Sequence, residues 1–187
     1  MQRNPNLQEF FFEAIAQAML AQGVELSKLS AHYLTRLLAS RGERIAPSVE
    51  TLAELHLHAA QAPKQEAIRL YRNLGDHALY TGGFFPQSLE SKAVGLDYYR
   101  SMGGAAYGQV ANLTGARDPF SQMFAELAKR FQDCLLLLSD VSNAARAAST
   151  GDLMALYEEW LRTRSRHAER RLAELGMIQT SADPLPT

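Results

Sequence analysis

The stretch that decides the fold is residues 118–144, DPFSQMFAELAKRFQDCLLLLSDVSNA. Its apolar residues recur every three or four positions, which places them on one helix face: Phe120, Met123, Phe124, Leu127, Phe131, Leu135, Leu138 and Val141. Asp118 is a typical N-cap, and Pro119 suits the first helical position. The pattern therefore predicts a central core helix of about 27 residues, or about 40 Å in length.

The rest of the chain also shows helical periodicity, and no segment alternates as a strand does. Helix-ending residues divide it into six further expected helices: about 6–22 up to Gly23, one ending at Gly42, one opening at Pro47 and Ser48, about 64–82 up to a turn at Gly82 and Gly83, about 91–113, and one from near Thr150 to Gly176. The sequence predicts an all-α, single-domain bundle of six or seven helices.

Length and composition limit the classes of protein to consider. A chain of 187 residues suits one domain, which we place at 1–176, followed by a disordered tail at 177–187. The 19 basic and 20 acidic residues nearly cancel, so nucleic acid and anionic membranes are unlikely partners. The single cysteine, Cys134, lies in an apolar run, which suits a buried thiol in a reducing compartment. With no signal-peptide or membrane-span pattern, the sequence predicts a cytoplasmic protein.

Glycine and tyrosine concentrate between residues 75 and 108. Glycine inside a helix costs about 1 kcal/mol relative to alanine, so several glycines there indicate close backbone approach. Gly104 and Gly108 form a small-x-x-x-small step that permits a close helix crossing or contact with a flat ligand. The predicted ligand site or interface comprises Asp76, His77, Tyr80, Phe84, Phe85, Tyr98, Tyr99, Met102, Gly104, Tyr107 and Gly108.

Asp76 and His77 are the candidates for chemistry in this segment. Asp76 lies four residues after Arg72 and four before Tyr80, which predicts an ion pair and a hydrogen bond along one helix side. His77 is either a hydrogen-bonded core histidine or a ligand and proton-transfer group. No Glu-x-x-His motif of a di-iron bundle occurs, so the sequence assigns no catalytic residue, metal ligand or cofactor.

A helix-turn-helix similarity forms a weaker alternative. Residues 32–38, HYLTRLL, followed by 47–52, PSVETL, look like the later part of such a module. The tight turn and basic face that DNA binding requires are not evident. The arginines of the one basic cluster, 162–171, interleave with glutamates, which indicates a solvated and paired helix surface.

The central motifs also resemble a family. Leu74-Gly75-Asp76, Leu79-Tyr80, Gly83-Phe84-Phe85-Pro86, Tyr98-Tyr99, Met102-Gly103 and Ala106-Tyr107-Gly108 are similar to a family of small bacterial helical proteins whose function is uncharacterised. The resemblance covers about residues 6–113 and implies a soluble, all-helical fold. It implies no activity, substrate or catalytic residue.

We expect a non-catalytic helical binding protein with a regulatory or adaptor role. Its ligand would be a partner protein or a small apolar molecule, and the wide apolar faces of the first and last helices favour a homodimer. The main alternative is a helical oxygenase-like or heme- or metal-dependent enzyme that uses the His77 region.

Overall fold

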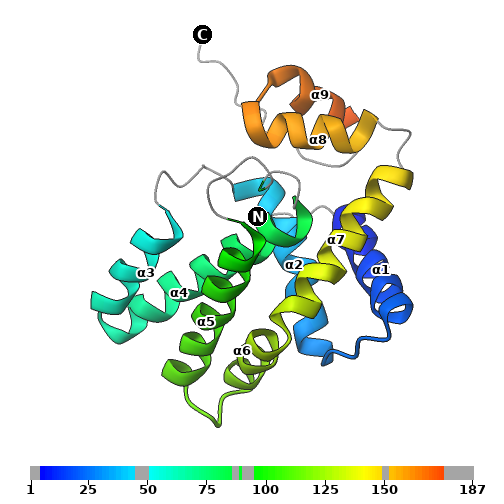
Figure 1. The fold of residues 1–187 in the computed structure, drawn as a ribbon. Helices are drawn as coiled ribbons and strands as arrows, with labels where there is room; N and C mark the ends of the chain where they lie inside the picture. The colour runs from blue at the N-terminus through cyan, green and yellow to red at the C-terminus, as the bar shows by residue number, and fades with distance from the viewer. Residues whose placement is uncertain (1–4, 45–50, 86–88, 90–94, 149–151, 175–187) are drawn as a thin grey trace.

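The computed structural model describes residues 5–44, 51–85, 89, 95–148 and 152–174. Every regular element within these ranges is helical, which confirms the all-α prediction (Figure 1). The elements are α1 (Pro5–Gln22), α2 (Lys28–Arg44), α3 (Leu52–Gln61), α4 (Lys64–Leu79), the π-helical turn η1 (Tyr80–Phe84), α5 (Leu96–Thr114), α6 (Pro119–Lys129), α7 (Phe131–Ala148), α8 (Asp152–Thr163) and α9 (Arg166–Glu174).

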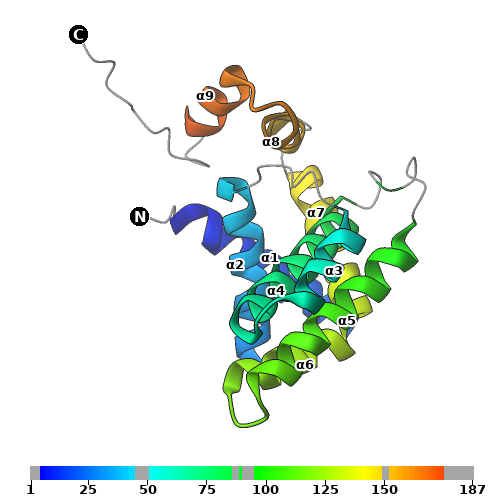
Figure 2. The same cartoon turned by 90° about the vertical axis from the view of Figure 1, so that its left-hand side faces the viewer.

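The helices pack as pairs that share one core. Helix α4 lies between α3 and α5, α5 packs against α6, and α1 packs against both α2 and α7. Figure 2 shows α8 and α9 together at one end of the other helices. Fully buried side chains from α1, α2, α4, α5 and α7 meet in the core: Ile15, Leu34, Leu74, Tyr107 and Leu138.

Local signals place several helix ends where the sequence predicts them. Helix α1 ends before Gly23, whose φ of 64° few other residues adopt readily. Helix α6 begins at the predicted cap, where the Asp118 carboxylate accepts a 2.8 Å hydrogen bond from the Phe120 amide. Helix α3 is capped by Thr51 and Glu54 in a reciprocal capping box.

The start of α2 is held by a carboxylate from another helix. Glu126 of α6 accepts hydrogen bonds from the Ser27 amide at 3.0 Å and from the Ser30 hydroxyl at 2.5 Å. Partial burial opposes ionisation of Glu126, but these hydrogen bonds outweigh it and hold the pKa of the carboxyl below its ordinary value. A negative charge at this position also complements the N-terminal end of the helix.

The predicted central helix is two helices, α6 and α7, because the chain bends at Arg130. Arg130 has φ −103° and ψ 24°, outside the helical range. The bend lets α6 follow α5 while α7 packs against α1 and η1. Leu127 and Phe131 are buried on either side of it. The apolar stripe therefore continues through the break and gives no sign of it in the sequence.

The predicted turn at Gly82 and Gly83 is also wrong. The helical path continues through both glycines as η1, and neither has a positive φ. A Cβ atom on Gly83 would lie 2.8 Å from the Cβ atom of Leu138 in α7. This glycine therefore serves the close packing of η1 on α7 rather than a reversal of the chain.

Other predicted boundaries shift. The last predicted helix is divided into α8 and α9, with Arg164 between them at φ 52°. Helix α2 runs past Gly42 to Arg44, α3 begins after the predicted opening, and α5 begins later than predicted. Pro47, Ser48, residues 90–94 and the predicted tail at 177–187 lie outside the described residues.

Candidate functional site

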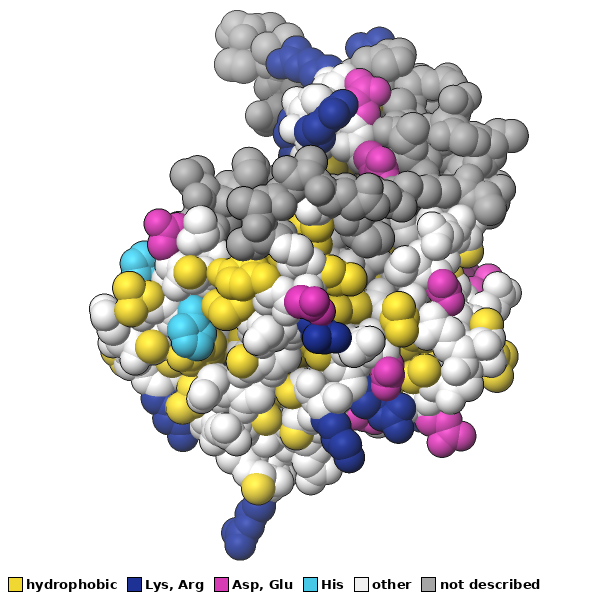
Figure 3. Space-filling model, in the orientation of Figure 1, with side chains coloured by type: hydrophobic (Ala, Val, Ile, Leu, Met, Phe, Trp, Pro, Cys, Tyr) yellow, Lys and Arg dark blue, Asp and Glu magenta, His cyan; other side chains and the backbone are white. Residues whose placement is uncertain are grey.

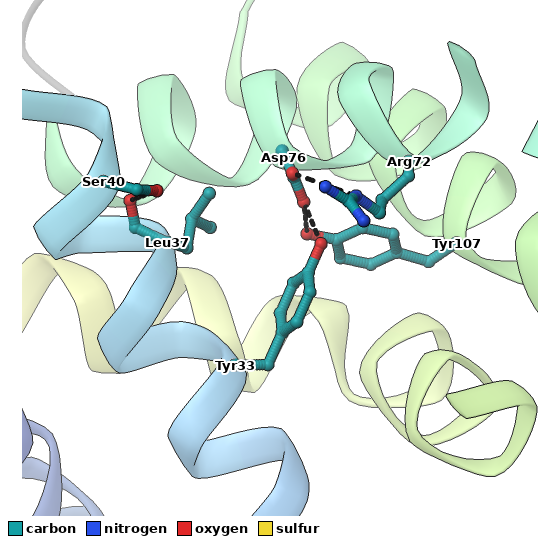
Figure 4. A network of polar contacts seen from close by, with 6 residues as sticks. All are labelled: Tyr33, Leu37, Ser40, Arg72, Asp76 and Tyr107. Carbon is teal, nitrogen blue, oxygen red and sulfur yellow. Dashed lines mark hydrogen bonds and ion pairs between the residues drawn. The ribbon is translucent and has the colours of Figure 1, made fainter. Parts of the chain in front are cut away.

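A part-buried polar network joins three helices. The hydroxyl of Tyr33 in α2 donates to Asp76 Oδ1 at 2.5 Å, and the hydroxyl of Tyr107 in α5 donates to the same oxygen at 2.8 Å. Figure 4 shows the two tyrosines converging on the aspartate from different helices. We call Tyr33, Arg72, Asp76 and Tyr107 the Asp76 network.

The electrostatics of the Asp76 network favour a fixed arrangement. The predicted ion pair is present, with Arg72 Nε 4.0 Å from Asp76 Oδ2. The Asp76 side chain is only 13 % exposed. Burial, followed by the nearby Asp76 charge, raises the pKa of both Tyr33 and Tyr107, so both hydroxyls stay protonated as donors. The hydrogen bonds of the network therefore connect α2 and α5 to α4.

Two glycines let the helices around this network approach closely. A Cβ atom on Gly75 would lie 2.5 Å from Tyr107 Cδ1, and one on Gly103 would lie 2.8 Å from the Cβ atom of Ala78. The expected close approach at Gly108 is not observed, since a Cβ atom there would meet no atom of the described residues within 4 Å. Gly104 has only ordinary contacts, the nearest at 3.6 Å. The tight α4–α5 crossing therefore depends on Gly75 of α4 and on Gly103 of α5, and Gly103 lies one residue before the predicted Gly104.

Apart from Tyr107, the predicted aromatic residues divide between two clusters. Tyr80, Phe84 and Phe85 stack or meet edge-on, with ring centroids 5.0–5.7 Å apart, and Phe84 also meets Phe11 of α1 at 6.0 Å. Tyr98 and Tyr99 form a separate edge-on pair at 5.9 Å. Tyr80, Phe84 and Tyr99 are buried, while Phe85, Tyr98 and Met102 are half-buried. These contacts make the segment part of the core.

The described residues give little support for metal or thiol chemistry. His77 is half-buried in the last turn of α4. Within the described part of the chain, no three His, Cys, Asp or Glu side chains are grouped to hold a metal ion. Cys134 is buried as predicted, and burial raises the pKa of its thiol to about 12, which keeps the thiol protonated and unreactive.

An apolar groove of about 880 Å³ lies elsewhere, between α1 and α2. We call it the α1–α2 groove; it is lined by Phe12, Ile15, Ala16, Met19, Leu20, Gly23, Val24, Glu25, Leu26, Lys28, Ala31, His32 and Thr35. Phe12 is 55 % exposed and Leu20 is 84 % exposed. None of the lining residues belongs to the predicted segment between 75 and 108.

The groove follows from the width of the apolar stripe on α1. Phe11, Ile15 and Ala18 fill the core, while Phe12 and Leu20 remain at the surface on another side of the same helix. A helix with so broad an apolar face has more apolar surface than α2 and α7 cover. The sequence predicts a wide apolar stripe on the first helix, but it does not show which part of that stripe stays uncovered. It also does not show that Tyr33 binds Asp76.

The surface charges and the helix lengths bear on the expectations about nucleic-acid binding and membrane spans. In Figure 3, acidic and basic side chains lie next to one another over the lower right of the face shown, without a separate basic patch there. The first part of the helix-turn-helix similarity, residues 32–38, lies within the single helix α2, and residues 47–50 of its second part lie outside the described ranges. None of the described helices is both long and apolar enough to cross a membrane.

Comparisons with protein-family models, curated proteins and solved structures found no match to this chain. Its function must therefore be inferred from its own contacts.

Proposed function

We propose that this chain is a non-catalytic binding protein and that the α1–α2 groove binds an apolar helix of a partner protein. The observation that carries the proposal is the exposure of two large apolar side chains at the groove, Phe12 at 55 % and Leu20 at 84 %. Fully burying such a side chain stabilises a complex by about 1.5–3 kcal/mol. The groove therefore offers a driving force for association.

The shape of the groove favours a helix as its occupant. On α1 the lining residues Phe12, Ala16 and Met19 follow the spacing i, i+4, i+7, and on α2 Lys28, Ala31 and Thr35 follow i, i+3, i+7. Two antiparallel helices thus present parallel stripes with an apolar trough between them. Amphipathic helices bind in such troughs through anchors at the same spacing.

A small apolar ligand fits the groove less well. Small-molecule sites bury most of the surface of the ligand, typically about 70–90 %. Here Leu20 stands 84 % exposed at the groove, so a small molecule bound beside it would remain largely in contact with water. A protein surface can cover the whole face, which suits the expected adaptor or regulatory role.

The test uses two phenylalanines of equal exposure. Phe12 lines the groove and is 55 % exposed, whereas Phe120 lies on α6 and is 56 % exposed. The fluorescent dye 8-anilinonaphthalene-1-sulfonate reports accessible apolar surface. At low micromolar protein concentration, we expect Phe12→Ser to remove most of the dye fluorescence and Phe120→Ser to leave it unchanged. Equal loss in both variants, or no loss in Phe12→Ser, would contradict the proposal.

A further inference from the structure

We propose that the partner is a second copy of this chain, bound through the α1–α2 face in a two-fold symmetric dimer. The proposal rests on the proposed function of the groove and adds the identity of the occupant. Its basis is that the two outer edges of this face are complementary to each other in both apolar residues and charge.

The outer edge of α1 is apolar near the turn to α2 and acidic away from it. Glu9, Glu13, Ala16 and Leu20 follow the spacing i, i+4, i+7, i+11, so they share one side of the helix. All four are exposed. We call these four residues the α1 edge.

The outer edge of α2 has the same apolar end and the opposite charge. Leu29, His32 and Arg36 follow the spacing i, i+3, i+7 and are all exposed, with Leu29 at 37 %. We call these three residues the α2 edge. Both edges thus begin with an exposed leucine near the turn, and the charged residues farther from it are glutamates on α1 and an arginine on α2.

Matching residues on the two edges lie at similar distances from the turn that joins α1 to α2. Helices α1 and α2 run in opposite directions from the turn after Gln22. Glu13 is nine residues before the end of α1 and Arg36 is eight after the start of α2, so each lies about 12–14 Å along its helix. Leu20 and Leu29 each lie within about 3 Å of the same end.

A two-fold axis running along the groove would bring these edges together. Two antiparallel helix pairs then form a four-helix arrangement in which the α1 edge of one copy lies against the α2 edge of the other. Leu20 meets Leu29 of the second copy, and Glu13 faces its Arg36. Phe12 and Met19, which line the groove, are covered between the four helices.

Charge reversal and rescue test this arrangement. The association state is measured by light scattering coupled to size-exclusion chromatography, over protein concentrations from low to high micromolar. We expect the wild type to dimerise, and Glu13→Arg or Arg36→Glu alone to raise the dimer dissociation constant about tenfold, since the symmetry repeats each contact. The double variant Glu13→Arg/Arg36→Glu should restore dimerisation. Arg117→Glu, an exposed reversal outside the face, is the matched control.

The outcomes separate this inference from the proposed function. A wild type that stays monomeric at every concentration, while its dye binding still depends on Phe12, overturns the dimer and leaves the groove as a site for another protein. A dimer that survives both single reversals, or that the double variant does not restore, also overturns the inference. Absence of Phe12-dependent dye fluorescence at a concentration where light scattering shows the protein to be monomeric contradicts the proposed function itself.

Discussion

The Asp76 network and the α1–α2 groove differ in how fully their side chains are covered by the rest of the chain. At the network, Tyr33 and Tyr107 donate to one carboxylate, and Gly75 and Gly103 allow the helices to close around it. At the groove, the apolar stripe of α1 is only partly covered, and Leu20 is 84 % exposed. The side chains of the first region contact one another within the chain, whereas the second region leaves apolar surface exposed.

The difference shows that residue type alone does not tell which apolar surface stays uncovered. Glycine and tyrosine suggest a site between residues 75 and 108, and within that segment Gly75, Gly103 and Tyr107 pack in a helix crossing. The uncovered surface belongs instead to ordinary leucine, phenylalanine and alanine residues of an N-terminal helix pair. Substitutions at the network should therefore change stability, whereas substitutions at the groove should change association.

The largest effect on stability is expected from Asp76→Ala. This change leaves the hydroxyls of Tyr33 and Tyr107 without their shared acceptor, and each buried unsatisfied hydroxyl costs about 1–3 kcal/mol. We expect a loss of about 2–4 kcal/mol in the free energy of unfolding, measured by urea denaturation. Tyr33→Phe removes one donor and should cost less. A loss below about 0.5 kcal/mol for Asp76→Ala would show that the network does not stabilise the packing of the three helices.

A pair of glycine substitutions tests the close crossing. In Gly103→Ala the new methyl group would clash with the Phe131 ring and lie 2.8 Å from the Cβ atom of Ala78, so we expect a loss of about 1–3 kcal/mol. In Gly108→Ala the new methyl group would meet none of the described residues within 4 Å, and the gain in helix propensity should stabilise the protein by about 0.5–1 kcal/mol. Thermal and urea unfolding measure both. Equal effects at the two positions would contradict the assignment of the crossing to Gly103.

The Glu126 cap on α2 predicts that the stability of the protein depends on pH. Because the pKa of Glu126 is lowered in the folded protein, its contribution to stability is complete above the ordinary glutamate pKa of about 4.3. That contribution is lost as the pH falls through the folded-state value. Glu126→Gln should lower the free energy of unfolding by about 1 kcal/mol at pH 7. The difference should disappear once the pH is below the folded-state pKa of Glu126. A cost that does not change between pH 7 and pH 3 would exclude the charged cap.

Groove substitutions should have the smallest effect on the stability of the monomer. Phe12 and Leu20 are already largely exposed, so Phe12→Ser and Leu20→Ser should each change the free energy of unfolding by less than about 0.5 kcal/mol at low protein concentration. Urea denaturation measures this, with Leu57→Ser, 56 % exposed on α3, as the control. A loss of several kcal/mol would place the groove residues in the core and remove the contrast between the regions.

Features that depend on near neighbours in the chain could be predicted from the sequence. The all-α fold follows from apolar periodicity, and the end of α1 at Gly23 and the start of α6 at Asp118 follow from local capping. The Arg72–Asp76 ion pair follows from the i, i+4 spacing. Each of these is decided within one or two helical turns.

Features that depend on distant segments could not be predicted. The bend at Arg130 interrupts no apolar stripe, and Gly83 is needed because α7 approaches it, not because the chain turns there. Tyr33 reaches Asp76 from another helix, and no local pattern joins the two. The groove likewise depends on which part of α1 the other helices leave uncovered.

The central claim is that the uncovered α1–α2 face joins two copies edge to edge, and a mixed cross-linking experiment tests it most directly. Two single variants, Leu20→Cys and Leu29→Cys, are mixed and oxidised mildly; the native Cys134 is buried and does not compete. The account predicts that the mixture forms a disulfide-linked dimer joining residue 20 to residue 29, much faster than Leu20→Cys mixed with Leu57→Cys. Equal rates in the two mixtures would contradict it.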